Sequence, residues 1–433
     1  MRTPASVPSA PVHQPVRPWL DRRWLIGTYG VFLAYAVLSA IFAGDRDKVW
    51  AIWAACGYAA ALLLLWRSRA RTAAVLVAVA VAVLAPLLLL SVAYPLETGM
   101  VVIDRSATLL IHHGSPYLPS AQVTSWFSYN PYLPVMTLFG LPGAAGLSGL
   151  AGNSGVWLAL GTVAVLAAAF WIAMPHQRCA SCRRDALLAT AIAVSSPLIA
   201  LNLAVITTDP PVLALMLLAL ALAADPARAA IVRAASAGAV LGIACDMKST
   251  AWLAVPVMAA MFASRDGVRA AGRFIAAAVL TGVVLIAALA PATLFRREAA
   301  AALVQNSVLF PLGLTHDKTP AESLLPGHLL AEMGTAGRVV SVGLLLAAGL
   351  AVAISLVIRP PRDLSAACWR LAIGLALMFL LGPDVRFGYF IYPLGLLGWL
   401  ALNSGAPGAE NQLPDARAYA RLWKAGRAEA ERE

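Results

Sequence analysis

Charged residues are scarce in this chain. Asp, Glu, Lys and Arg make up 12% of its 433 residues, whereas a soluble domain carries about 25%. Apolar residues make up 61% of the sequence, and the mean hydropathy is +0.78. This composition excludes an ordinary soluble domain. It predicts an all-α polytopic membrane protein, because apolar runs of about 20 residues cross a bilayer as helices.

Cysteine and lysine are also rare. The chain has five cysteines, too few for a disulfide framework. Cys179 and Cys182 have CxxC spacing, but no second pair completes a zinc site, so a plain cytoplasmic loop is the favoured interpretation and no metal is expected. Lysines are four of the 32 basic residues. With the abundance of alanine, this bias is typical of a GC-rich bacterial genome and suggests a bacterial plasma membrane.

The net charge of +11 does not indicate nucleic-acid binding. The basic residues stand in short clusters between apolar runs, where they set the orientation of the crossings. No glycine-rich nucleotide-binding loop is present. We therefore expect membrane lipids, and no nucleic acid or nucleotide, around this chain.

The basic clusters predict which loops lie outside the cell. Arginines precede the expected first crossing, residues 24–43, and others separate the second and third, residues 49–66 and 72–94. Because basic loops stay in the cytoplasm, the loop 95–155 should be on the outer face. Continuing the alternation gives about twelve crossings.

These crossings would form a single domain, residues 24–403, with a second outer loop at 293–336. Residues 1–23, rich in Pro, Ser and Val at their start, are expected to be a disordered cytoplasmic tail. Residues 404–433 are expected to be a cytoplasmic C-terminal tail.

The loop 95–155 begins with a predicted amphipathic helix lying on the membrane surface. Its apolar face consists of Ile103, Ala107, Leu110 and Ile111. Asp104, Thr108 and His112 form a polar stripe on another face, which would place Asp104 in water. Gly114 suits the left-handed position that ends a helix, and Pro116 cannot continue one.

Residues 129–145 are apolar but short and rich in proline. Arg183 and its basic neighbours follow the next crossing, residues 156–174, and look cytoplasmic. That arrangement requires residues 129–145 to remain outside, as a re-entrant or surface helix.

Polar residues from four separate segments should meet at the outer level of the membrane. They are Asp104 with His112 and His113, then Asp209, then Lys248, and finally Asp384 with Arg386. Charges in short turns between apolar helices are costly unless they are solvated or paired. We therefore predict a water-filled cleft open to the outer leaflet.

The order of these motifs resembles the GT-C superfamily of membrane glycosyltransferases, and within it glycosyltransferase family 87, over residues 72–403. The matching features are Asp104, the Gly114-Ser-Pro-Tyr117 turn, Tyr129-Asn-Pro-Tyr-Leu-Pro134, Thr207-Thr208-Asp209, Lys248 and Arg386-Phe-Gly-Tyr389. The chain departs from the family pattern where Tyr-Pro-Pro reads Tyr-Asn-Pro, where a Gly-Gln-type turn reads Thr-Thr-Asp, and in two extra helices before the loop.

The resemblance implies a GT-C-like helix bundle and a glycosyltransferase similar to polyprenol-phosphate-mannose-dependent mannosyltransferases. Such an enzyme moves a hexose from a polyprenyl-phosphate donor to a lipid or glycan acceptor on the outer face, without a cofactor. The resemblance carries the general base onto Asp104. Lys248 and Arg386 are the candidates for holding the donor phosphate. The other candidate substrate-binding residues are His112, His113, Tyr117, Tyr129, Asp209 and Tyr389.

Each assignment has an alternative. Asp104 could only solvate a surface helix, Lys248 could extend to the membrane interface, Arg386 could pair with Asp384, and Asp209 could simply begin a helix. For the whole chain, the alternative is a transporter or lipid flippase without chemistry. A transporter or flippase would be expected to have charges near mid-membrane and inverted repeats, and the sequence shows neither pattern.

Overall fold

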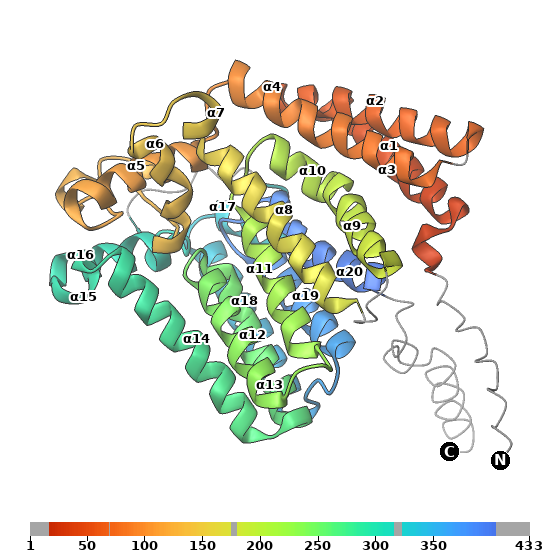
Figure 1. Ribbon diagram of the computed structural model, residues 1–433. Coiled ribbons are helices and arrows are strands. Elements are labelled where there is room, and N and C mark those ends of the chain that lie inside the picture. Colours follow the sequence, from red (N-terminus) through yellow and green to blue (C-terminus); the bar gives the residue numbers. More distant parts are fainter. Residues whose placement is uncertain (1–16, 69, 175–179, 316–322, 404–433) are drawn as a thin grey trace, which may run out of the picture.

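The computed structural model describes residues 17–68, 70–174, 180–315 and 323–403 (Figure 1). Within these ranges every regular element is a helix and no strand occurs, which confirms the all-α fold class. The expected tails fall largely outside the described residues, at 1–16 and 404–433. Pro18–Leu20 forms a 3-10 turn that buries Trp19, and the first long helix begins at Arg22.

Seven helical segments in the described part of the chain are long and apolar enough to cross a membrane. They are α1 (Arg22–Phe42), α2 (Asp45–Arg67), the continuous run α3–η2–α4 (Arg71–Ala93), α8 (Ser154–Ala173), α14 (Val268–Leu289), α18 (Thr335–Ile358) and α19 (Leu364–Leu381). The chain therefore has the helices of a multi-pass membrane protein.

The expected count of twelve crossings is not confirmed. The pair α9 (Ala180–Ser195) and α10 (Pro197–Ala204) is bent by 68°, and counting it as one span gives eight. Other predicted crossings correspond to shorter helices. Each has fewer than the about 20 residues that a single helix needs to cross the membrane. These are α11 (Asp209–Ala224), α12 (Ala230–Cys245), α13 (Ala254–Asp266) and α20 (Ile391–Asn403).

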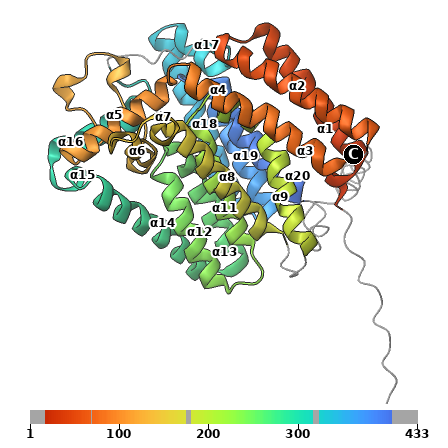
Figure 2. The same ribbon diagram turned by 45° about the horizontal axis from the view of Figure 1, so that its top comes forward.

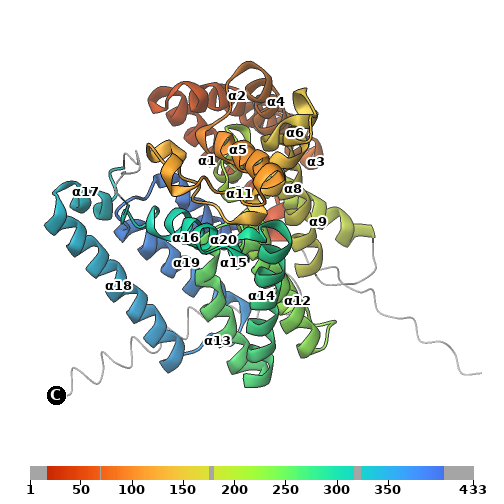
Figure 3. The ribbon, with the colours of Figure 1, turned by 90° about the vertical axis from the view of Figure 1, so that its left-hand side faces the viewer.

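The helices α1 to α4 pack on one another as an N-terminal layer, seen at the upper right in Figure 2. This layer joins the remaining helices through α9 and α10. At the left edge of the molecule in Figure 3, α18 lies beside α19. The surface of α18 is largely exposed. An exposed apolar face of this kind is expected where a helix meets lipid.

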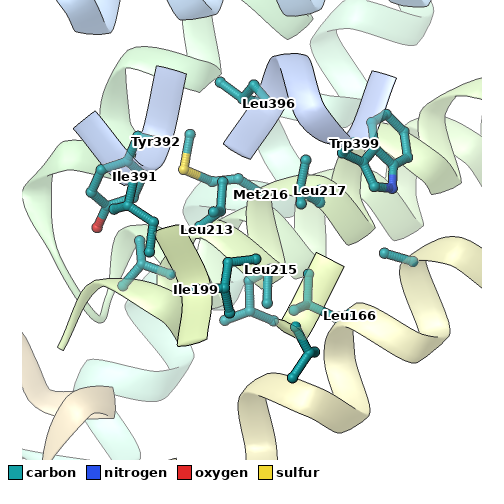
Figure 4. Packing of buried hydrophobic residues seen from close by; sticks show 14 of the residues in the cluster. Leu166, Ile199, Leu213, Leu215, Met216, Leu217, Ile391, Tyr392, Leu396 and Trp399 are labelled. Atoms are coloured by element: carbon teal, nitrogen blue, oxygen red, sulfur yellow. The ribbon is translucent and has the colours of Figure 1, made fainter. Parts of the chain in front are cut away.

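The centre of the bundle is α11, whose side chains are buried on nearly every face. It packs against α8, α12 and α20, and Figure 4 shows Leu213, Met216 and Leu217 of α11 between residues of the neighbouring helices. A helix that is apolar all round belongs inside a bundle. Its first residue, Asp209, is thereby placed at the centre of one end of the molecule.

The connections at that end contain short helices: α5 (Thr98–His113), α6 (Leu141–Ala144) and α7 (Gly149–Gly152) from the first loop, and α15 (Ala292–Phe295), α16 (Arg297–Val304) and α17 (Pro326–Glu332) from the second. Figure 1 shows α5 and α6 near α15 and α16 at the left of the bundle. The two predicted loops therefore meet at the same end, where α11 begins.

The predicted helix in the first loop is confirmed as α5, and it ends at Gly114 with a left-handed φ of 67°. The prediction that Asp104 faces water is wrong. The segment η5 (Pro134–Gly140) folds back over α5, and a Cβ on Gly140 would lie 3.2 Å from Cα of Asp104. Asp104 is half-buried, because this return of the chain covers the first residue of the polar stripe, whereas Thr108 and His112 farther along the stripe are exposed. Together η5 and α6 form an apolar helical segment of eleven residues, too short to cross.

Candidate active site

A cavity of about 410 Å³ lies where the two loops meet the ends of the central helices. It combines acidic, basic and aromatic side chains from segments that are distant in sequence. The charged residues on its wall are Glu97, Asp209, Lys248, Asp384 and Arg386. Two cations and three carboxylates in one apolar bundle form a polar site that the rest of the fold surrounds.

Lys248 and Asp209 form a buried ion pair at the base of this cavity. Their charged atoms, Nζ and Oδ1, are 2.5 Å apart, and both residues are less than a tenth exposed. The hydroxyl of Tyr392 donates a second hydrogen bond, of 2.8 Å, to the same Oδ1. Burial opposes the charge of Lys248, but the adjacent carboxylate outweighs it, so the pKa of Lys248 lies above its ordinary value.

Asp209 is fixed by the start of α11. Pro210 and Pro211 follow it in the first turn, where proline is tolerated because those N–H groups have no helical partner. Just before it, Ile206 has a φ of 62°, which costs a β-branched residue about 1–3 kcal/mol. Thr207 turns back to hydrogen-bond Asn202 through both its backbone N–H and its hydroxyl. The strained turn directs the chain from α10 into the buried helix.

Lys248 is held by the turn between α12 and η6 (Ser249–Leu253). The carbonyls of Asp246 and Met247 in this turn accept hydrogen bonds from the N–H groups of Val135 and Leu133. The first loop is therefore tied directly to the lysine turn. The ammonium of Lys248 lies 4.6 Å from the ring centre of Tyr389, a favourable cation–π distance.

Glu97 supplies a carboxylate that the sequence analysis did not assign. It caps α5 by accepting a hydrogen bond from the N–H of Gly99, and it lines the cavity. Burial raises its pKa, while Gly99, Arg386 and Lys248 each act to lower it. The sequence feature that could have pointed to Glu97 is its position, since it is the first acidic residue after the third predicted crossing.

One wall of the cavity is aromatic. The rings of Tyr129 and Phe310 are stacked with centres 4.3 Å apart. Trp126 and Phe127 also line the cavity, and both are exposed. Arg105 of α5 donates hydrogen bonds to the carbonyls of Phe127, Ser128 and Tyr129, so the segment that carries this wall is clamped to the helix.

The structure brings five of the nine predicted site residues together. Tyr129, Asp209, Lys248, Arg386 and Tyr389 line the cavity. They come from four segments of the chain: the first loop, the start of α11, the turn after α12 and the connection between α19 and α20.

The other four predicted residues are not on the cavity wall, as far as the described residues define it. Burial raises the pKa of the Asp104 carboxyl, and the nearby side chain of Ser154 at the start of α8 acts to lower it. The Oδ1 atom of Asp104 is buried without a hydrogen-bond partner among the described residues. His112 and His113 are exposed in the last turn of α5. Tyr117 is buried beneath the cavity, where its hydroxyl donates to the carbonyl of Tyr132. Its role there is to support the loop.

Within the described ranges, no group of three or more His, Cys, Asp or Glu side chains is placed to hold a metal. His316, Asp317, Lys318 and Cys179 lie outside those ranges.

No protein-family model matches the chain. No match is found among curated proteins, and none among solved structures. The functional argument for this protein therefore rests on its cavity.

Proposed function

We propose that this protein is a membrane glycosyltransferase that moves a sugar, a hexose such as mannose, from a polyprenyl-phosphate donor to a lipid or glycan acceptor. The observation that carries the proposal is the meeting of Lys248 and Arg386 with Glu97 in one cavity. Cations are needed for the phosphate that leaves, and a carboxylate is needed for the acceptor proton.

The reaction balances with these groups alone. The bond between the sugar C1 and the phosphate oxygen breaks, and its electron pair leaves with the lipid phosphate. The acceptor oxygen forms the new bond to C1, and its proton passes to the base. Lys248 and Arg386 would stabilise charge as it grows on the departing phosphate. On the aromatic wall, the exposed rings of Trp126 and Phe127 provide flat faces against which sugar rings can pack.

Glu97 replaces Asp104 as the proposed base. Glu97 lines the cavity that holds the cations, whereas Asp104 is directed to Ser154 of α8. A raised pKa also suits a base, because it brings the carboxylate closer to the operating pH and strengthens its hold on the proton. Asp209 is less suited, since its carboxylate already accepts from Lys248 and Tyr392.

The test is transfer of a labelled hexose from a polyprenyl-phosphate donor by the purified full-length chain in lipid. Glu97→Gln removes the proton acceptor and keeps the side-chain size, so we expect the rate to fall about 10²–10⁴-fold. Asp104→Asn is the matched carboxylate-to-amide control and should keep the rate within a few-fold.

Two outcomes would count against this assignment. A Glu97→Gln protein that transfers at the parent rate removes Glu97 as the base. Loss of transfer on Asp104→Asn alone returns that role to Asp104.

If the chain moves the intact lipid between leaflets and never releases its sugar, the protein is a transporter and the proposal of a transferase falls.

A further inference from the structure

A second cavity, of about 490 Å³, lies between α1, α8, the α9–α10 bend, α11 and α20. Its lining is apolar except for a few hydroxyl and ring N–H groups, and none of the described residues that line it is charged. Aromatic rings from four elements take part, among them Phe32 of α1, Phe170 of α8 and Trp399 of α20. Such a space suits a hydrocarbon chain and excludes a polar ligand.

The two cavities share one segment of the chain. In η8 (Phe387–Phe390) and the residue before it, Arg386, Gly388 and Tyr389 line the charged cavity, while Phe387 and Phe390 line the apolar one. Sequence neighbours therefore face two different environments. A molecule with an anionic head and a hydrocarbon tail could occupy both cavities by passing along η8.

The apolar cavity continues from η8 along α20. Leu394, Gly398 and Leu402 lie on its wall, one turn apart, and the helix rises about 12 Å from the first to the last. The absence of a side chain at Gly398 helps to keep this path open, since an added Cβ there would meet no described atom within 4 Å.

We propose that this cavity is the binding groove for the hydrocarbon chain of the polyprenyl-phosphate donor, whose phosphate lies at Arg386 and Lys248. This inference rests on the proposed function. It assigns α1 a role in donor binding, although α1 precedes residues 72–403, over which the sequence resembles a known family. Continuity with the cationic site favours this occupant over the acyl chain of a bilayer lipid.

The test is binding of sugar-free prenyl phosphates to the full-length protein in nanodiscs, measured by native mass spectrometry. Decaprenyl phosphate should bind at least tenfold more tightly than dimethylallyl phosphate, which has a single isoprene unit, because additional methylenes are buried. Gly398→Leu fills the groove and should abolish this preference while leaving dimethylallyl phosphate unchanged. Val31→Trp adds bulk from the facing α1 wall, where Val31 is 69% exposed, and should have the same effect.

Gly343→Leu on α18 is the matched control, because an added Cβ at Gly343 also meets no atom of the described residues within 4 Å and Gly343 lies outside the groove. It should keep the parent chain-length preference. The proposal is overturned if both groove variants keep that preference, if the parent protein has none, or if phosphatidylglycerol displaces decaprenyl phosphate at equal concentration, which would make the groove a bilayer-lipid site.

The groove and the proposed function can fail separately. If the groove variants lose the chain-length preference but no sugar transfer is ever detected, the groove stands and the transferase assignment falls. If transfer proceeds and Gly398→Leu leaves the donor KM unchanged, the groove assignment falls and the transferase stands.

Discussion

Single residues in this protein carry charge where the surroundings are least able to solvate it. Lys248 and Asp209 are tolerated because each neutralises the other, and removal of one partner from a buried pair typically costs about 3–5 kcal/mol. Stability alone does not explain the pair, since apolar residues of similar size often serve as well. The pair and Tyr392 hold an ammonium against the cavity wall in a fixed position, which is the arrangement that binding an anion requires.

Asp246 lies two residues before Lys248 and is 2% exposed. Neither of its carboxylate oxygens has a hydrogen-bond partner among the described residues, and burial raises its pKa to about 8. The folded protein therefore keeps Asp246 protonated over a range where the unfolded chain, with a carboxyl pKa near its usual value of about 3.9, has already lost the proton.

From this shift we predict a pH-dependent loss of stability. The contribution of Asp246 is complete below about pH 4 and is lost as pH rises toward 8, by about 1.4 kcal/mol per pH unit at most. Asp246→Asn mimics the protonated acid and should remove this dependence. The measurement is the thermal midpoint of both proteins in detergent from pH 5 to pH 8. The thermal midpoint of the Asn variant should exceed that of the parent protein by an amount that grows with pH. If the difference between the two midpoints is constant across this range, Asp246 is already ionised in the folded state.

At the scale of helices, close packing depends on glycine at specific positions. Along α12, Gly238 and Gly242 stand four residues apart and face α14, as small residues do where membrane helices approach closely. A Cβ at Gly238 would meet the carbonyl oxygen of Phe274, and one at Gly242 would lie 2.6 Å from that of Ala278. Backbone atoms cannot move aside cheaply, so these glycines set the distance between the two helices.

The expected effect is that Gly238→Ala destabilises the protein by about 1–3 kcal/mol, the usual cost of overpacking. The control is Gly282→Ala on α14, where an added Cβ meets nothing within 4 Å in the described part of the chain. Alanine there should be neutral or stabilise the helix by up to about 1 kcal/mol. Thermal or urea unfolding in detergent would compare them. Equal effects of the two changes would mean that α12 and α14 are not in close contact.

The helices also show where sequence periodicity is informative. It identified α5 and its end at Gly114, because a helix of sixteen residues with a glycine stop is decided locally. It could not show that η5 folds over Asp104, since that depends on a segment about thirty residues away. For this reason Asp104 was expected in water, and Glu97, which carries no periodic signal, was not assigned.

At the scale of the whole molecule, composition was enough to predict an all-helical membrane protein, but not the number of crossings. Counting by charge alternation treats every apolar run as a span. The structure instead contains a helix bent by 68° and several helices below spanning length. The sequence predicted that Asp209, Lys248 and Arg386 would meet, because each stands in a polar turn between apolar runs, and all three line one cavity. The side of the membrane that this cavity faces is a separate prediction. The ion pair between Lys248 and Asp209 could not be predicted from the sequence. It depends on the burial of α11 at the centre of the bundle, which places Asp209 beside Lys248.

The orientation of the whole molecule gives a last prediction. Asp104 of α5 contacts Ser154 at the first residue of α8, and α8 then rises about 30 Å over its twenty residues before the basic residue Arg183 in α9. The loop around α5 and the start of α9 therefore lie at opposite ends of the bundle. Since basic loops remain cytoplasmic, we expect the loop and its cavity to be outside the cell.

The measurement is labelling of single cysteines by an impermeant maleimide in right-side-out vesicles of the cysteine-free protein. Thr124→Cys, at an exposed position of the loop, should react at once, whereas Arg183→Cys should react only after the membrane is permeabilised. Both positions are exposed, so a difference reports sidedness and not burial. If both react from outside, the two ends are not separated by the bilayer. If only Arg183→Cys reacts, the cavity faces the cytoplasm, where nucleotide sugars are available, and the lipid-phosphate donor loses its main justification.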